Sequence, residues 1–157
     1  MSGTRNTIIT VTSLIVLTTS QALHADWNVK KRSGASSQCY LESDSIEMQD
    51  GYRAISVRAE LDGNNLVIVT PSNVDNSYSD IRVQVDYKAP IKAAGLIGNN
   101  SVRFSDLSDE MIVDMKKGLK LRAYIRFWPT WPATKAQPVT FSLVGFTAAY
   151  NGLKSCS

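Results

Sequence analysis

Four carboxylates are the residues of this chain whose spacing comes closest to that of an acid–base site. Asp109, Glu110 and Asp114 lie close together in a predicted helix, and Asp86 lies near a lysine. A glycosidase needs two carboxylates that face each other across a cleft in different environments. The helical acids are followed by two lysines and are typical of a solvated helix face. The sequence therefore predicts no catalytic residue among them.

Histidine and cysteine, which many catalytic and zinc sites require, are nearly absent. The chain has one histidine, His24, and two distant cysteines, whereas zinc draws most of its ligands from these residue types. No Gly-x-Ser-x-Gly, Ser-x-x-Lys or glycine-rich phosphate motif occurs. Residues 75–80 offer oxygen ligands but lack the glycine and final glutamate of an EF-hand loop. The sequence predicts no active site, no metal and no cofactor.

The first 25 residues have the pattern of a secretory signal peptide. Arg5 supplies the positive charge, residues 7–17 are mostly apolar or β-branched, and small residues precede possible cleavage after Ala22 or Ala25. Cleavage after Ala25 removes His24. The expected location is the periplasm of a Gram-negative bacterium or the medium outside the cell. An uncleaved membrane anchor is the alternative.

Residues 26–157 have a length and composition that suit one domain. The apolar part of the signal peptide is too short for a comfortable membrane span, and no later stretch approaches that length. The full chain has a formal net charge of +3, without the dense basic surface that nucleic-acid binding needs. We therefore expect no nucleic-acid partner and no stable membrane insertion after signal cleavage.

The two cysteines, Cys39 and Cys156, lie near opposite ends of the predicted domain. Disulfides form and persist in exported proteins, so the sequence predicts one bridge between them. In the chain-entropy model, closing a loop of roughly 115–120 residues stabilises the fold by about 4–5 kcal/mol. Two unpaired thiols are the alternative, since the spacing is unlike that of a redox-active pair.

Short strands dominate the predicted secondary structure. Residues 52–61 alternate between apolar and polar, as a half-buried antiparallel strand does. The Asp-Gly-Asn-Asn run at 62–65 favours a turn, and 66–70 returns as the partner strand. Further strands are predicted at 26–32, 38–42, 80–87, 101–104, 119–127 and 138–146, with an edge strand or loop at 89–98.

Alternation also assigns the two faces of the strands at 80–87 and 119–127. The predicted inward residues are Ile81, Val83, Val85, Tyr87, Leu119, Leu121, Ala123, Ile125 and Phe127. The predicted outward residues of the second strand are Lys120, Arg122, Tyr124 and Arg126.

One amphipathic helix is predicted at about 107–117. Leu107, Met111, Ile112 and Met115 recur at spacings of three and four residues, and Gly118 is expected to end the helix in a left-handed conformation. A short helical turn is expected at 147–153. These elements favour an all-β, single-domain antiparallel β-sandwich with one short α-helix. A closed small barrel is the alternative.

The Phe-Trp-Pro-Thr-Trp-Pro segment at 127–132 is the most distinctive part of the predicted domain. Proline stiffens the loop, and rigid aromatic side chains are typical of binding hot spots. Folding of both indole rings over the open end of the sandwich is the alternative. The basic run at 30–32 is typical of a solvated strand end. The candidate binding residues are Trp128, Thr130 and Trp131, with Arg122, Tyr124 and Arg126 on the preceding strand.

Several stretches resemble parts of one bacterial family. The PVTFSLVGFTAAYNGL run at 138–153 looks like a closing strand, a Gly-Phe corner and an alanine-rich turn, and 111–121 looks like the preceding helix, glycine and strand. Together with Trp-Asn-Val at 27–29 and Cys39, they resemble the invasion-associated locus B family of periplasmic proteins. Members often carry further cysteines after the opening strand and ahead of the helix, whereas 30–32 and 101–108 have none. Cys156 is then the expected partner of Cys39.

The resemblance implies a small exported β protein that is linked by name to host-cell invasion. The predicted function is that of a non-catalytic envelope protein that binds a partner protein of the envelope or host, or a surface polymer such as a glycan. An inhibitor or immunity-type protein that blocks an envelope enzyme is the alternative. A third hypothesis is an enzyme that uses a carboxylate or lysine without histidine.

Overall fold

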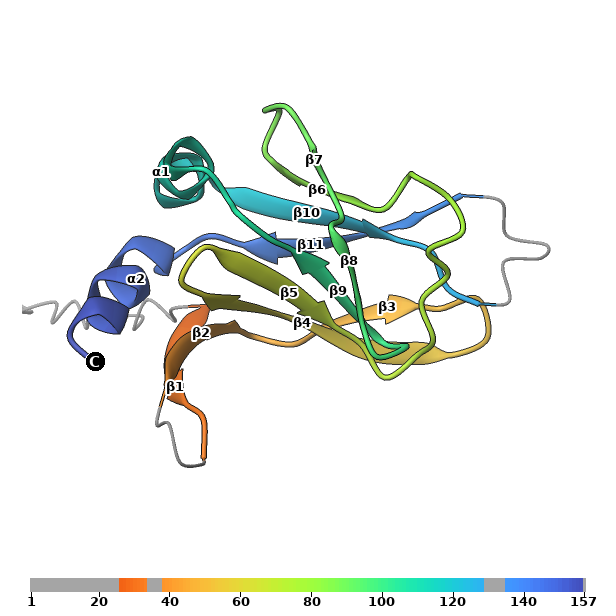
Figure 1. Cartoon of the computed structure of the whole chain (residues 1–157), viewed down its shortest axis with the longest axis horizontal. Coiled ribbons are helices and arrows are strands. Elements are labelled where there is room, and N and C mark those ends of the chain that lie inside the picture. The colour runs from red at the N-terminus through yellow and green to blue at the C-terminus, as the bar shows by residue number, and fades with distance from the viewer. Residues whose placement is uncertain (1–25, 34–37, 129–134, 157) are drawn as a thin grey trace, which may run out of the picture.

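The computed structural model describes residues 26–33, 38–128 and 135–156, which form two antiparallel sheets packed face to face (Figure 1). The larger sheet has the order β1-β2-β4-β5-β9-β8, with β3 also paired to β4, and the smaller has the order β11-β10-β6-β7. The larger sheet contains β1 (Trp27–Lys31), β2 (Cys39–Ser43), β3 (Ile46–Gln49), β4 (Ala54–Asp62), β5 (Asn65–Val69), β8 (Gly95–Ile97) and β9 (Ser101–Phe104). The smaller contains β6 (Arg82–Val85), β7 (Ile91–Lys92), β10 (Lys120–Ile125) and β11 (Gln137–Ser142). The predicted β-sandwich is confirmed.

The β4–β5 hairpin shows how the sequence sets the strand register. Asp62 pairs with Asn65 across the turn, and the alternation of β4 follows from there. Gly63 has φ +57°, a conformation that glycine adopts without steric cost. Alternate β4 side chains then face the core, while Arg58 and Glu60 point to the outer face.

The core lies between the sheets and extends beneath two helices, α1 (Asp109–Lys117) and α2 (Phe146–Lys154). Apolar side chains from the inner faces of both sheets fill it, as close packing of a sandwich requires. Its largest fully buried side chains include Trp27, Leu41, Phe104, Phe141 and Phe146.

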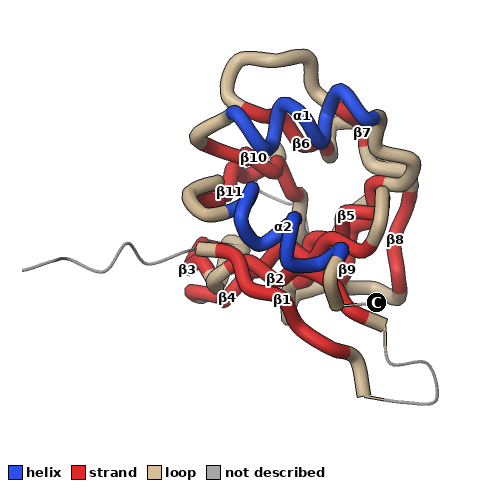
Figure 2. Tube along the Cα trace, turned by 90° about the vertical axis from the view of Figure 1, so that its left-hand side faces the viewer, coloured by secondary structure: helices blue, strands red, loops and turns tan. Residues whose placement is uncertain are grey.

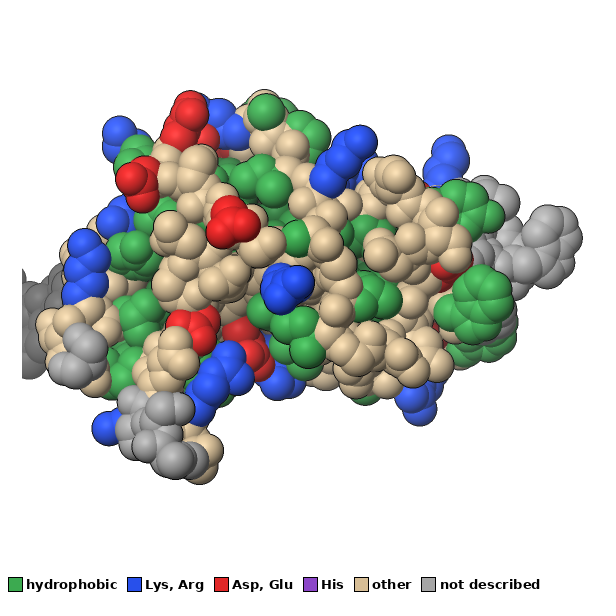
Figure 3. All heavy atoms as spheres, in the orientation of Figure 1, with side chains coloured by type: hydrophobic (Ala, Val, Ile, Leu, Met, Phe, Trp, Pro, Cys, Tyr) green, Lys and Arg blue, Asp and Glu red, His purple; other side chains and the backbone are tan. Residues whose placement is uncertain are grey.

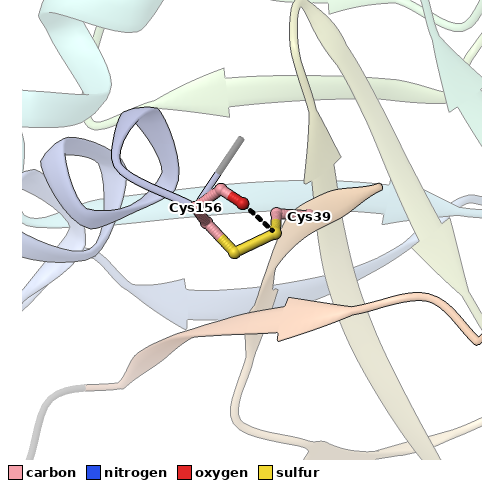
Figure 4. The surroundings of a disulfide bond; sticks show 2 residues. All are labelled: Cys39 and Cys156. Atoms are coloured by element: carbon pink, nitrogen blue, oxygen red, sulfur yellow. Dashed lines mark hydrogen bonds between the residues drawn. A yellow bond between two sulfur atoms is a disulfide. The ribbon is translucent and has the colours of Figure 1, made fainter. Parts of the chain in front are cut away.

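Both helices lie at one end of the sandwich, as Figures 1 and 2 show from two directions. In α2, the ring of Phe146 meets Trp27 edge to face, with centroids 5.1 Å apart. The indole Nε1 of Trp27 donates a hydrogen bond to the carbonyl oxygen of Ser142 at 2.7 Å. The disulfide between Cys39 and Cys156 ties the end of α2 to β2, with Cα atoms 6.1 Å apart (Figure 4). The predicted bridge is confirmed.

Helix α1 forms as predicted, but its end differs. The Ser108 side chain accepts a hydrogen bond from the backbone N–H of Met111 at 3.2 Å and caps the first turn. The expected left-handed conformation of Gly118 is wrong, since φ is −77° and ψ is 169°. The chain passes directly into β10 there. A Cβ at this position would lie 2.6 Å from Val85 Cγ1 and 2.9 Å from Asp86 Oδ2.

Two predicted core positions are exposed. The inward assignment of Tyr87 is wrong because β6 ends at Val85 and Asp86, with φ +44°, turns the chain. Tyr87 is 92% exposed, and Leu119, which precedes β10 rather than belonging to it, is 70% exposed.

The structure also differs from the prediction at β3 and in the C-terminal elements. Strand β3 was not predicted, because its alternation of apolar and polar residues extends over only four positions. The last strand was predicted to reach residue 146 but ends at Ser142, and Gly145, with φ +79°, leads directly into α2. Helix α2 is a full helix rather than the expected short turn. None of the helices in the described ranges has the length and apolar character needed to cross a membrane. The predicted signal peptide, 1–25, lies outside the described residues.

Candidate functional site

The outer face of the smaller sheet carries four basic side chains, which we call the cationic face. They are Arg82 on β6, Lys92 on β7, and Lys120 and Arg122 on β10. Arg82 lies directly opposite both Lys92 and Tyr124 in the strand register. Residues directly opposite each other share one side of a sheet, so an ammonium, a guanidinium and a phenol ring form a row across three strands.

Backbone carbonyls and an aromatic ring hold the two arginines of the cationic face. The Cζ atom of Arg82 lies 3.8 Å from the centroid of the Tyr124 ring, within cation–π range. Its NH1 donates to the carbonyl oxygen of Asp80 at 2.9 Å. The NH1 of Arg122 donates to the carbonyl oxygen of Asp86 at 3.1 Å. Both guanidinium groups are therefore ordered without being neutralised.

Two arginines at the outer face of the larger sheet, Arg32 and Arg58, have a different environment. Arg58 lies 3.3 Å from a carboxylate oxygen of Glu42 and 2.9 Å from one of Glu60. Arg32 lies 3.2 Å from the other oxygen of Glu60. Figure 3 shows acidic and basic side chains in contact over this part of the molecule. Two carboxylates balance two guanidinium groups, so this cluster is electrically neutral.

No cation of the cationic face forms an ion pair with a carboxylate of the described residues. The nearby acid, Asp86, is bound to the backbone instead: its two carboxylate oxygens each accept a 3.0 Å hydrogen bond, from the N–H groups of Leu119 and Lys120. Positive charges that lie close together without carboxylate partners repel one another and attract anions. The cationic face therefore favours an anionic ligand.

Arg126 does not belong to this surface. The prediction that it points outward is wrong, because β10 ends at Ile125 and the side chain turns inward to Asp80. Arg126 is 5% exposed and forms an ion pair with that carboxylate. Its hydrogen bond holds the pKa of Asp80 below the usual carboxyl value, against the opposing effect of burial. The Cζ atom of Arg126 also lies 4.2 Å from the Tyr78 ring centroid.

Exposed aromatic side chains mark the end of the sandwich opposite the helices. Tyr52, Tyr78 and Trp128 are 69%, 53% and 60% exposed, and Figure 3 shows hydrophobic side chains gathered at this end. The backbone N–H of Trp128 donates to the carbonyl oxygen of Asn73 at 2.9 Å. The alternative that the Trp128 ring is buried over the sandwich does not hold. Thr130 and Trp131 lie outside the described residues.

A small pocket adjoins the cationic face at β7. Its volume is about 250 Å³, just below the range typical of small-molecule sites. Lys92 belongs both to the pocket and to the cationic face, which joins the two features. The pocket is lined by Asn76, Tyr78, Ser79, Ile81, Lys92 and Ala93.

The structure does not bring the candidate carboxylates together across a cleft. Asp114 pairs with Lys88 at 3.2 Å, Asp109 and Glu110 occupy the first turn of α1, and Asp86 binds backbone N–H groups. In the described part of the chain, no three metal-ligating side chains of the His, Cys, Asp and Glu types form a group.

Sequence reasoning found only part of this surface. Arg122 and Tyr124 were predicted to face outward and do so, and Trp128 was predicted as a contact residue and is exposed. Arg82 and Lys92 were missed, although the alternation at 80–87 already placed Arg82 opposite the core. The position of Lys92 depends on pairing between β6 and the short edge strand β7. No local sequence pattern predicts this pairing.

Comparison with known proteins identifies a solved structure that has the same fold. No protein-family model and no curated protein matches the chain. Among solved structures, the crystal structure of invasion associated protein B from Bartonella henselae matches with a TM-score of 0.57 and 18% identity, covering 83% of this chain and 93% of that chain. The resemblance to the invasion-associated locus B family is confirmed at the level of the fold, which this chain shares with that protein.

Proposed function

We propose that this chain is an exported, non-catalytic envelope protein that binds a partner protein or a surface polymer. The cationic face and the neighbouring aromatic end form the contact surface. The observation that carries this proposal is the difference between two pairs of arginines, one on each sheet. Arg32 and Arg58 are neutralised by carboxylates, whereas Arg82 and Arg122 are ordered by rings and carbonyls and keep their charge available.

Trp128 supports the same function. A large ring that is 60% exposed loses little entropy on binding and buries a large area. Its backbone is fixed by the bond to Asn73, so the side chain is presented from an ordered position. Residues 129–134 continue from this point and contain the second candidate, Trp131.

Export is part of the proposal and rests on residues 1–25. The disulfide supports it, because such bridges persist in oxidising compartments. The described fold begins at Asp26, whose N–H donates to the carbonyl oxygen of Val144 at 3.2 Å. Cleavage after Ala22 or Ala25 would leave this contact and the buried Trp27 intact.

Affinity capture from a native envelope extract tests the binding function. Immobilised protein is compared with Arg82→Gln/Arg122→Gln and with Trp128→Ala, which should both fold normally and lose most of the captured material. The matched control is Lys30→Gln/Arg103→Gln, which removes the same charge from exposed positions on β1 and β9, outside the cationic face and the aromatic end. Equal capture by all four proteins would contradict the proposal.

A further inference from the structure

We infer that the cationic face binds an acidic polysaccharide, one sugar of which occupies the pocket beside Lys92. This inference rests on the proposed function and names the class of its ligand. The ligand is a carbohydrate chain bearing carboxylates at regular intervals, laid across the strands of the smaller sheet.

The arrangement of side chains favours an extended ligand. One row across the sheet contains Lys92, Arg82 and Tyr124. The next contains Gln84, Arg122 and Thr140. Adjacent strands lie about 4.8 Å apart, so positive charges, hydrogen-bonding groups and a ring recur over short distances on an open surface. This order suits a polymer with repeated anionic and hydroxyl groups better than a single small anion.

The pocket supplies a subsite at the end of the first row. Its polar lining includes the Asn76 amide, the Ser79 hydroxyl and the Lys92 ammonium group, and the Tyr78 ring forms part of the wall. Amide and hydroxyl groups can both donate and accept hydrogen bonds, as sugar hydroxyls require. The ammonium group can meet a sugar carboxylate in the same space.

Charge and composition separate this ligand from other anions. A full-chain net charge of +3 is too small for nucleic acid, whose affinity depends on neutralising many phosphates. An acidic peptide supplies carboxylates but not the closely spaced hydroxyl groups that the Asn76 amide and the Ser79 hydroxyl can bind. The exposed rings of Tyr78 and Tyr87 instead present flat apolar faces beside charged groups, and Arg122 lies 5.8 Å from the Tyr87 ring centroid.

Direct binding to three probes tests the inference. The purified protein is titrated with polygalacturonate, with neutral dextran and with poly-glutamate of similar length. We expect binding to polygalacturonate that weakens with salt, no binding to dextran, and at least tenfold weaker binding to poly-glutamate. Equal affinity for polygalacturonate and poly-glutamate would overturn the inference, since charge alone would then explain both.

Two exposed residues that line the pocket, Lys92 and Ser79, test the subsite, each with a matched control. Lys92→Gln should weaken polygalacturonate binding at least fivefold, whereas Lys30→Gln on β1 should leave it within twofold. Ser79→Ala should weaken binding about threefold, whereas Ser45→Ala, which lines a different cavity, should not. If Lys92→Gln or Ser79→Ala behaves as its control does, the subsite is wrong.

The result also separates the inference from the proposed function. If polygalacturonate does not bind but capture of envelope material still depends on Arg82 and Arg122, the ligand class is wrong and the binding function stands. If neither depends on these arginines, both fail.

Discussion

Gly118 illustrates how one residue joins a helix, a turn and a strand. Its φ of −77° suits any residue, so its role is to allow close approach rather than unusual backbone geometry. A Cβ would lie 2.6 Å from Val85 Cγ1 and 2.8 Å from the carbonyl oxygen of Asp114. The adjacent turn after β6 carries Asp86, which positions Arg122 through its carbonyl oxygen.

Gly118→Ala should lower the free energy of unfolding by about 1–3 kcal/mol, as overpacking does. Gly152→Ala is the matched control, because its Cβ would meet only Val29 Cγ2 at 3.4 Å and alanine favours a helix. Urea denaturation measures both variants. Equal stability of the two would show that the loop has room for a methyl group.

Asp80 and Arg126 form an ion pair that is largely shielded from water. Asp80→Asn leaves the buried guanidinium without its counter-charge and should cost about 2–3 kcal/mol, less than for a fully buried pair because Asp80 remains partly exposed. Asp106→Asn is the control, since Asp106 is exposed with φ +57°, which asparagine tolerates. Similar losses in both variants would contradict this role.

The pair also makes stability depend on pH. Because Arg126 lowers the pKa of folded Asp80, the pair stabilises the fold above the ordinary carboxyl pKa. This stabilisation is lost as pH falls from the ordinary value through the lowered one. Unfolding measured from about pH 7 to about pH 3 should therefore show a steeper acid loss for the wild type than for Asp80→Asn. Parallel profiles would exclude the pair as a cause.

At the scale of elements, α2 depends on a bridge between distant parts of the chain. The Cys39–Cys156 disulfide closes a sequence separation of 117 residues, and the chain-entropy model assigns it about 4–5 kcal/mol. Reduction should lower the urea midpoint of the wild type strongly. The double Cys→Ala variant should show the lower midpoint with or without reductant. An unchanged midpoint after reduction of the wild type would contradict the prediction.

The sequence predicts elements best where the pattern is local. Alternation predicts β4 and β10, and the Asp-Gly-Asn-Asn turn fixes β5, which pairs with β4. The apolar spacing of α1 is equally clear. Tyr87 and Leu119 were misplaced because alternation does not reveal where a strand stops, and Asp86 ends β6 through a positive φ. Strand β3 alternates over only four residues and is revealed by its pairing with β4.

The residues of the candidate surface were likewise predicted only where the sequence pattern is local. The outward positions of Arg122 and Tyr124 can be predicted from the alternation of one strand, whereas the lack of carboxylate partners around the cationic face depends on contacts between distant residues. Only the structure shows that Glu60 neutralises Arg32 and Arg58 while Asp80 turns to Arg126. The pocket brings together residues 76–81 and 92–93, which the sequence separates.

At the scale of the whole molecule, residues 26–157 are proposed to form an exported domain. Mass spectrometry of the periplasmic fraction should find a chain that begins at Leu23 or Asp26 and contains one disulfide. The control is the same protein expressed without residues 2–25, which should remain in the cytoplasm. A full-length chain with reduced thiols in the cytoplasmic fraction would contradict export.

The most direct test of the central claim is the affinity of the captured envelope ligand for two double variants of equal charge. Arg82→Gln/Arg122→Gln should bind at least tenfold more weakly than the wild type, a loss of about 1.4 kcal/mol. Lys30→Gln/Arg103→Gln should remain within about twofold, because these positions lie outside the cationic face and the aromatic end. Equal weakening of both variants would show that overall charge, rather than the ordered arginines of the smaller sheet, determines binding.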